Sequence, residues 1–330
     1  MPHFCDRGFT GSEIMRIVFF ALFFSLFGSL SSFSSEALGS GNEARVVIIS
    51  DLNGSYGSTT YGSDVKAAIR RLVELRPDLV LATGDLVAGQ KAGLDYRAMW
   101  KGFHAVVTEP LEKAGIPLAV TAGNHDGSAY PRYALERKIF GEEWITHKPK
   151  LQFHEGGQYP YFYAFVFNQV LYLSIDSTRV GPLPHDQLSW LEKELKAKPD
   201  TMRAVVFTHV PLFHFANVPE GESFFDEALA DLLDRFGVNL YLTGHHHSFY
   251  PGFHHRTHFV SQACLGSGPT FLNGREQRSE KAFTVIDFKE NGFEIKALKA
   301  PLYLEPIDPK TLPSSITSKG KTLLLKDQSP

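Results

Sequence analysis

Residues able to bind metal ions follow five separate apolar segments of this 330-residue chain. In chain order they are Asp51 and Asn53; Asp85; Asn124, His125 and Asp126; His209; and His245 and His247. Carboxylates, amide oxygens and imidazoles together suit divalent ions such as Mn, Fe or Zn. Two carboxylates and several neutral donors are enough for two ions if one carboxylate bridges them. Two ions about 3.5–4 Å apart can activate water and stabilise the entering and leaving oxygens of a phosphoryl transfer, so the set favours phosphate ester hydrolysis.

The elements that would hold these residues alternate between strands and helices. Continuous apolar runs, typical of buried strands, end directly before each polar group, at residues 45–50, 79–83, 117–122, 204–208 and 239–243. Helical spacing predicts helices at residues 65–75, 94–114, 184–196 and 224–236. Because the carboxyl ends of parallel strands meet at one sheet edge, the polar side chains are expected to converge there.

Three further patterns refine this expectation. Asn168-Gln169 between two apolar runs predicts a hairpin of residues 161–167 and 170–175. Strand patterns also lie at residues 259–265, 282–288 and 293–299. If residues 245–247 are extended, His245 and His247 share one face, and His246 points elsewhere, with a surface position favoured over the pocket rim.

Composition excludes several classes of protein. The chain is 43% hydrophobic, which is enough for a sizeable core, and its 33 basic and 36 acidic residues give a net charge of -3. Without a basic excess, binding to duplex nucleic acid is disfavoured. The only cysteines, Cys5 and Cys264, cannot form a disulfide framework. No G-x-S-x-G motif supports a serine hydrolase.

The N-terminal region has the pattern of a targeting signal. Arg16 precedes an apolar run at residues 17–30, and small residues follow it. The run is shorter than the roughly 20 residues of a membrane span. We therefore predict a signal peptide over residues 1–37, with Met15 as an alternative start, and a periplasmic or secreted mature chain without stable membrane insertion. A retained membrane anchor is the alternative. The tail at residues 301–330 is expected to wrap the surface or to be disordered.

The ordered set of motifs resembles the calcineurin-like metallophosphoesterase superfamily, whose pattern is D-x-H, G-D, G-N-H-[DE], H and G-H-x-H. Here these are Asp51-Leu52-Asn53, Gly84-Asp85, Gly123–Asp126, His209 and Gly244–His247. The resemblance implies an α/β fold, a four-layer α/β/β/α sandwich of two mixed β-sheets flanked by helices, over residues 38–300. It also implies two divalent metal ions of the Mn/Fe/Zn class and no organic cofactor.

The resemblance assigns a role to each residue. Asp85 would bridge the two ions, Asp51 and His247 would bind the first, and Asn124, His209 and His245 would bind the second. His125 would act on the phosphate or the leaving-group oxygen, with Asp126 orienting its ring. The implied reaction is attack on phosphorus by a metal-bound hydroxide, on a small phosphate mono- or diester. The motif G-N-H-D leans toward the phosphodiesterase-like branch.

Two departures from the superfamily bear on this prediction. Asn53 stands where a histidine normally binds the first metal, and an amide oxygen is a harder and weaker donor than imidazole. Ala88 stands where purple acid phosphatases carry a metal-binding tyrosine, so an iron–tyrosinate colour is not expected. The weakened first site keeps an alternative open: a non-catalytic metal-binding scaffold on the same fold.

Overall fold

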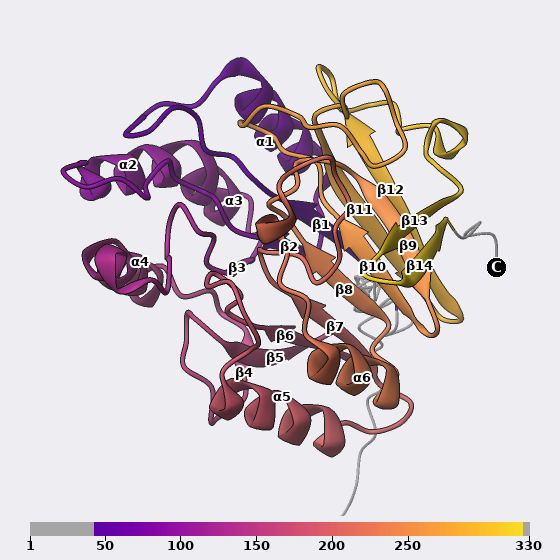
Figure 1. Cartoon of the computed structure of the whole chain (residues 1–330). Coiled ribbons are helices and arrows are strands. Elements are labelled where there is room, and N and C mark those ends of the chain that lie inside the picture. The colour runs from indigo at the N-terminus through magenta and orange to yellow at the C-terminus, as the bar shows by residue number, and fades with distance from the viewer. Residues whose placement is uncertain (1–42, 326–330) are drawn as a thin grey trace, which may run out of the picture. The chain divides into compact units, whose positions relative to one another are not determined.

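The computed structural model describes residues 43–325, so the predicted signal peptide lies outside the described residues. Five strands form one mixed sheet in the order β12-β11-β1-β2-β3 (Figure 1). Their bounds are β1 Ala44–Ile49, β2 Leu79–Ala82, β3 Leu118–Val120, β11 Ala282–Lys289 and β12 Gly292–Lys299. Strands β1, β2 and β3 run parallel, and β11 pairs antiparallel to β1. The three parallel strands therefore end at the same edge.

Nine strands form the second mixed sheet, in the order β13-β14-β9-β10-β8-β7-β6-β5-β4. Their bounds are β4 Gln152–Phe153, β5 Tyr163–Phe167, β6 Val170–Ser174, β7 Arg203–Phe207, β8 Leu240–Thr243, β9 Tyr250–His254, β10 Thr257–Ser261, β13 Ser315–Ser318 and β14 Lys321–Leu325. The four central strands β6, β7, β8 and β10 are parallel. The predicted hairpin is confirmed, since Asn168 and Gln169 connect β5 to β6 with positive φ angles of 45° and 60°.

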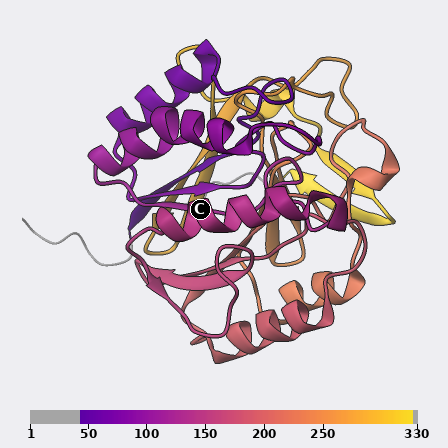
Figure 2. The ribbon, with the colours of Figure 1, turned by 90° about the vertical axis from the view of Figure 1, so that its left-hand side faces the viewer.

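Helices cover the outer face of each sheet (Figure 2). The helices are α1 Ser63–Leu75, α2 Tyr96–Phe103, α3 Glu109–Lys113, α4 Ala134–Thr146, α5 His185–Ala197 and α6 Glu227–Arg235. Helices α1 to α4 pack on the five-stranded sheet, and α5 and α6 pack on the nine-stranded one. Single 3-10 turns lie at Pro131–Tyr133, Glu220–Glu222 and Pro309–Thr311.

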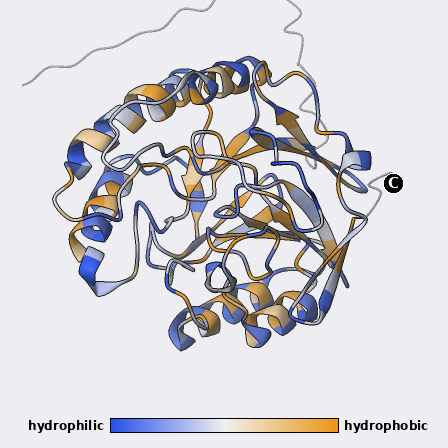
Figure 3. Cartoon of the chain, turned by 45° about the horizontal axis from the view of Figure 1, so that its top comes forward, coloured by the Kyte–Doolittle hydropathy of each residue, from blue (hydrophilic) through white to orange (hydrophobic). Residues whose placement is uncertain are grey.

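The alternation of side chains along β1 shows how the layers stack. Val47 and Ile49 face the helices, whereas Val46 and Ile48 belong to the core between the two sheets. Both faces of this strand are buried, which explains its continuous apolar sequence. The hydropathy colouring of Figure 3 shows the helices carrying hydrophilic and hydrophobic residues together, as expected for outer layers. The predicted four-layer sandwich is thus confirmed.

The predicted helix at residues 94–114 is interrupted. A π-helical turn, His104–Thr108, joins α2 to α3. Pro110 in the first turn of α3 has no backbone N–H to donate, which favours a local change in the hydrogen-bond pattern at this point. No helix among residues 43–325 is both long and apolar enough to cross a membrane.

The C-terminal tail differs from its prediction. Instead of wrapping the surface or being disordered, β13 and β14 form a hairpin that pairs with β9 and extends the nine-stranded sheet. Ile316 and Leu323 from this hairpin are buried in the core beneath α5 and α6. The alternation of buried and exposed residues along β13 and β14 is short, and the many Pro, Ser and Lys residues around it led to the wrong prediction.

Candidate metal centre

The ends of five strands bring the predicted ligands together. Asp51 follows β1, Asp85 follows β2 and Asn124 follows β3 in one sheet, while His209 follows β7 and His245 follows β8 in the other. The carboxyl ends of strands from the two sheets meet here, so that Asp51 and His247, 196 positions apart in the sequence, are in contact. The predicted convergence of these side chains is therefore observed.

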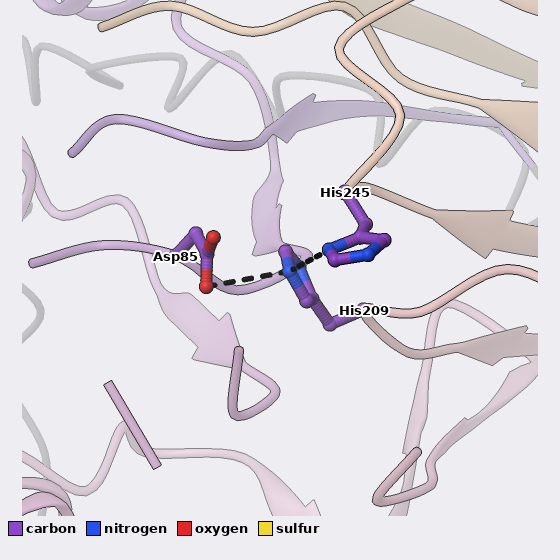
Figure 4. Close-up of side chains that lie close together, drawn as sticks. All are labelled: Asp85, His209 and His245. Atoms are coloured by element: carbon purple, nitrogen blue, oxygen red, sulfur yellow. Dashed lines mark hydrogen bonds and ion pairs between the residues drawn. The ribbon is translucent and has the colours of Figure 1, made fainter. Parts of the chain in front are cut away.

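His209 lies at the middle of the larger group. Its Nε2 atom is 3.3 Å from Asp85 Oδ1 and 3.2 Å from His245 Nδ1 (Figure 4). The same Nε2 atom lies 2.9 Å from Asn124 Oδ1. The ligand atoms of Asp85, His209 and His245 lie within 4.8 Å of one another, close enough to hold one ion. The family resemblance assigned Asp85 to the bridge, and His209 and His245, together with Asn124, to the second metal.

Asp51 and His247 form the smaller group. Asp51 is completely buried, and its Oδ1 lies 3.1 Å from His247 Nε2. Its Oδ2 accepts hydrogen bonds from Ser50 Oγ at 2.6 Å and from the backbone N–H of His245 at 3.1 Å. The backbone of His245 therefore connects the smaller group, Asp51 and His247, to the larger group that contains the His245 side chain.

The outer nitrogen of each histidine faces an acceptor. His209 Nδ1 lies 2.7 Å from the carbonyl of Thr83, and His247 Nδ1 lies 2.9 Å from the carbonyl of Gly268. A carbonyl only accepts, so these outer nitrogens carry the hydrogen. In the neutral rings, the inner nitrogens then point lone pairs at carboxylate and amide oxygens.

These inner nitrogen and oxygen acceptors repel one another at such short distances unless a positive charge lies between them. A proton on His209 Nε2 could satisfy only one of its three neighbours, whereas a metal ion can satisfy all of them. Burial lowers the pKa of His209, but the nearby Asp85 and Asp51 carboxylates outweigh burial and raise it to about 10. The residues present therefore fit divalent ions, with each histidine oriented by an outer hydrogen bond, as in known metal sites.

The backbone is strained where it delivers these ligands. Asp51, Asp85, His245 and His247 have positive φ angles of 52°, 56°, 68° and 51°, which non-glycine residues rarely adopt. Each such residue costs about 1–3 kcal/mol, and such strain is concentrated at functional sites. The segment at residues 245–247 is therefore not extended, so the condition for a shared face does not apply, although His245 and His247 both reach the centre.

Two of the motif glycines are required by close packing at the centre. A Cβ atom on Gly84, which has a φ of 88°, would lie 2.8 Å from His209 Nδ1. A Cβ atom on Gly244 would lie 2.2 Å from Ser50 Oγ and 2.9 Å from Asp51 Oδ2. Any other residue at these positions would displace a ligand or its support.

His125 lies at the mouth of the centre. Its Nε2 is 3.9 Å from Asp85 Oδ2, and its Nδ1 lies 3.2 Å from the carbonyl of Gly89. The prediction that Asp126 orients this ring is wrong. Asp126 instead accepts hydrogen bonds from the backbone N–H groups of Gly123 and Leu86, at 2.5 and 2.6 Å, and so shapes the turn that carries His125.

Asn53 and His125 line one pocket beside the metal centre. The amide oxygen of Asn53 accepts a hydrogen bond from Ser267 Oγ. The structure therefore places Asn53 beside the smaller group with its oxygen already engaged. The pocket is open and has a volume of about 530 Å³. Its lining includes Asn53, Tyr56, Asp85, His125, His247 and Ser267.

His246 is neither at the pocket rim nor on the surface, where the sequence favoured it. It is fully buried, and its Nδ1 accepts a hydrogen bond from the backbone N–H of Phe215 at 3.2 Å. Its Nε2 lies 3.0 Å from the carbonyl of Glu222. Burial and the neighbouring His245 lower its pKa well below the ordinary value, so the ring is a neutral support for the loop before α6.

Two residues near the centre, Gln90 and Glu222, were missed by the sequence motifs. Gln90 Oε1 accepts a hydrogen bond from Asn124 Nδ2 at 3.1 Å, which fixes the amide so that its oxygen faces inward. Glu222 Oε2 lies 2.7 Å from His245 Nε2. The exposed ring of Tyr56 lies 5.4 Å from the ring of His125. No motif contains Gln90, which lies five residues after Asp85, or Glu222, which lies in the loop before α6, because the motifs cover only the strand ends that carry the ligands.

The fold and the donor set together define a candidate metal centre at the strand ends of an α/β sandwich, and comparison with known proteins shows the family. The family model described as calcineurin-like phosphoesterase matches residues 44–249. The serine/threonine-protein phosphatase CPPED1 of Mus musculus is 27% identical over 162 residues, which cover 46% of this chain and 48% of the mouse protein. The chain thus spans about half the length of this curated relative.

Solved structures show the same fold. A dimetal phosphatase of Danio rerio aligns with 86% of this chain and 100% of its own, with a TM-score of 0.54 and 14% identity. A purple acid phosphatase from yellow lupin, Lupinus luteus, aligns with 78% of this chain and 51% of its own, with a TM-score of 0.58 and 18% identity. The chain belongs to the calcineurin-like phosphoesterase family, a family of metal-dependent phosphoric ester hydrolases.

Proposed function

We propose that this chain hydrolyses small phosphate mono- or diesters with two divalent ions. One observation carries the proposal: inward-facing acceptor atoms of His209, Asp85, Asn124 and His245 meet at separations of 2.9–3.3 Å beside an open pocket. Divalent cations can satisfy all of these atoms together, and phosphate esters are substrates whose developing charge such cations stabilise.

The residues divide between the two ions. Asp51 and His247 would hold the first ion, while Asn124, His209 and His245 would hold the second, with Asp85 between them. When bound, the ions supply Lewis-acid chemistry that activates water and neutralises charge on the phosphate oxygens. Mn, Fe and Zn all suit this mixture of oxygen and nitrogen donors.

His125 would act on the leaving-group oxygen. The contact between its Nδ1 and the carbonyl of Gly89 holds the ring by its outer edge and leaves Nε2 directed toward Asp85 and the pocket. From this position Nε2 can donate a proton, or a hydrogen bond, to the departing alcohol. The chain thus provides a general acid beside the ions rather than within their ligand set.

The direct experiment uses the purified chain, loaded with Mn, on aryl phosphate mono- and diesters. Turnover should disappear with a chelator and return with the metal. Asp85→Asn should lower kcat at least 100-fold, because the bridging charge is lost. The exposed Asp200→Asn is the matched control and should leave kcat unchanged.

The alternative is a metal-binding scaffold without turnover, which the loss of a histidine at position 53 favours. Full metal occupancy without hydrolysis of any tested ester would establish the scaffold and overturn the proposed activity. The pocket beside His125 argues for the enzyme, since a scaffold has no use for an acid directed at bound substrate.

We further propose that the protein is exported. The support is the apolar run at residues 17–30 with its small-residue exit, in a segment that precedes the described residues. N-terminal sequencing of the protein recovered from the periplasm or the medium tests this. A new N-terminus near residue 38 is expected, whereas an uncleaved chain in the membrane fraction would support the anchor.

A further inference from the structure

A second group of metal-binding side chains lies between α2 and α4, apart from the centre described above. His104 begins the π-helical turn after α2, and Glu143 and His147 lie four residues apart at the end of α4. One ligand atom from each of the three lies within 4.8 Å of the other two. The rings of His104 and His147 stack with centroids 3.9 Å apart, and His104 Nε2 is 3.4 Å from Glu143 Oε2.

His104 supplies the observation that points to a ligand. The residue is only 7% exposed, and its Nδ1 is already engaged with Thr108 Oγ1 at 2.9 Å. Its Nε2 is buried and makes no well-formed hydrogen bond within the described residues; its nearest partner is Glu143 Oε2 at 3.4 Å, and an ion between the two would satisfy both atoms. Leaving a buried polar atom unsatisfied costs about 1–3 kcal/mol, so native proteins usually provide a partner.

The surroundings hold the three ligands from outside. Arg97 contacts both Glu142 and Glu143 and fixes the Glu143 carboxylate. Glu112 Oε1 lies 3.7 Å from His147 Nδ1. With Lys138, which lies 3.6 Å from Glu142, three acidic groups stand near two basic ones, so a divalent cation does not face an excess of positive charge.

Aromatic rings form the inner wall. Trp100, Phe103 and Trp144 all contact the ring of His104, with centroids 5.7–5.8 Å away. This wall keeps His104 in place and excludes water from its inner side. His147 and Glu143 are half-buried, so an ion could enter from the solvent side.

We propose that His104, Glu143 and His147 bind one divalent ion of the zinc type. Two imidazoles and one carboxylate with an open fourth position form a known tetrahedral zinc set. His104 Nε2 and Glu143 Oε2 are already 3.4 Å apart, and rotation of the half-buried His147 ring would complete the set. The ion would link the segment from α2 to α3 with α4, and we assign it a structural role on that ground.

The test must separate this ion from those of the catalytic centre. The full chain is dialysed against Zn²⁺, and bound zinc is counted by elemental analysis in wild type, His147→Gln, Glu143→Gln and, as a control, the exposed His185→Gln. We expect His147→Gln and Glu143→Gln each to lose one equivalent of zinc, and the control to lose none. Phosphoesterase turnover at saturating Mn should stay within about twofold of wild type in all three.

A second readout guards against misfolding. In an Asp85→Asn background, Zn²⁺ should raise the Tm by a few degrees, and adding His147→Gln should remove most of that shift while leaving the metal-free Tm similar. Equal zinc counts and equal Tm shifts with and without His147 would overturn the proposal. Because these readouts do not use activity, they stand even if the chain proves to be a non-catalytic scaffold.

Discussion

Glu222 Oε2 lies 2.7 Å from His245 Nε2 and so connects the loop before α6 to the metal centre. A carboxylate only accepts, so His245 carries its hydrogen on Nε2 and presents Nδ1 to His209. The hydrogen bond from His245 lowers the pKa of Glu222, which keeps the carboxylate charged. Glu222 is thus a positioning residue for a ligand of the second ion.

Removing this support should weaken metal binding more than catalysis. For Glu222→Ala, the Mn concentration giving half-maximal activity should rise about 10-fold or more, the usual effect of losing an outer hydrogen bond to a metal-binding histidine. Glu222→Gln, which still accepts a hydrogen bond, should recover part of the loss. The exposed Glu227→Gln is the control. An unchanged metal requirement in Glu222→Ala would refute the assignment.

The role of His125 predicts a dependence on the leaving group. His125→Ala should lower kcat about 10²–10⁴-fold for alkyl phosphate esters, whose leaving alcohols need a proton. The loss should be much smaller for nitrophenyl esters, whose leaving group departs as a stable anion. Steady-state rates across a series of esters measure this slope. An equal loss for all esters would assign His125 to charge stabilisation instead.

Tyr56 should contribute to binding of aromatic leaving groups. Its ring is 56% exposed and stands beside His125 at the pocket. Tyr56→Ala should raise KM for aryl phosphates roughly 3–10-fold, since an aromatic pair contributes about 0.5–1.5 kcal/mol. Tyr56→Phe keeps the ring and should behave like wild type. Inhibition by inorganic phosphate should not change, and a parallel change would show that Tyr56 affects the ions.

Asn53→His restores the histidine that the family carries at this position. A stronger donor beside Asp51 and His247 should lower the Mn or Zn concentration needed for half-maximal activity. Because Ser267 Oγ contacts the present amide, Ser267→Ala should be combined with Asn53→His to make room. Ser267→Ala alone serves as the control. If titration calorimetry finds no gain in affinity, position 53 does not ligate the first ion.

Glu136 should make stability depend on pH. It is 1% exposed, and burial raises its pKa from 4.5 to about 7, against the hydrogen bond from the backbone N–H of Gln90. Between pH 4.5 and 7 the folded chain holds a proton that the unfolded chain releases, so the free energy of unfolding falls as pH rises through this window.

Glu136→Gln should remove that dependence. At constant metal content, denaturant unfolding should show the variant more stable than wild type by up to about 3 kcal/mol at pH 8 and nearly equal at pH 4. The exposed Glu305→Gln should follow wild type at both values. A constant difference across the pH range would mean that packing, not titration, sets the effect.

The sequence by itself determined the parallel strands and the ligands at their ends. A strand that is buried on both faces needs a continuous apolar sequence. A metal centre needs carboxylate and imidazole side chains. Both features therefore depend on residue type and can be predicted from the sequence. The sequence alone therefore predicted the series of candidate ligands from Asp51 to His247 and the hairpin at Asn168-Gln169.

Only the tertiary structure decided how those ligands are held. Three contacts depend on how separate loops pack together. Glu222 contacts His245, Gln90 accepts a hydrogen bond from Asn124, and Asp126 accepts hydrogen bonds that shape a backbone turn. The same holds for buried His246 and for the hairpin of β13 and β14 on β9. Local sequence patterns do not predict these contacts, because packing between segments distant in the sequence sets hydrogen-bond partners and side-chain directions.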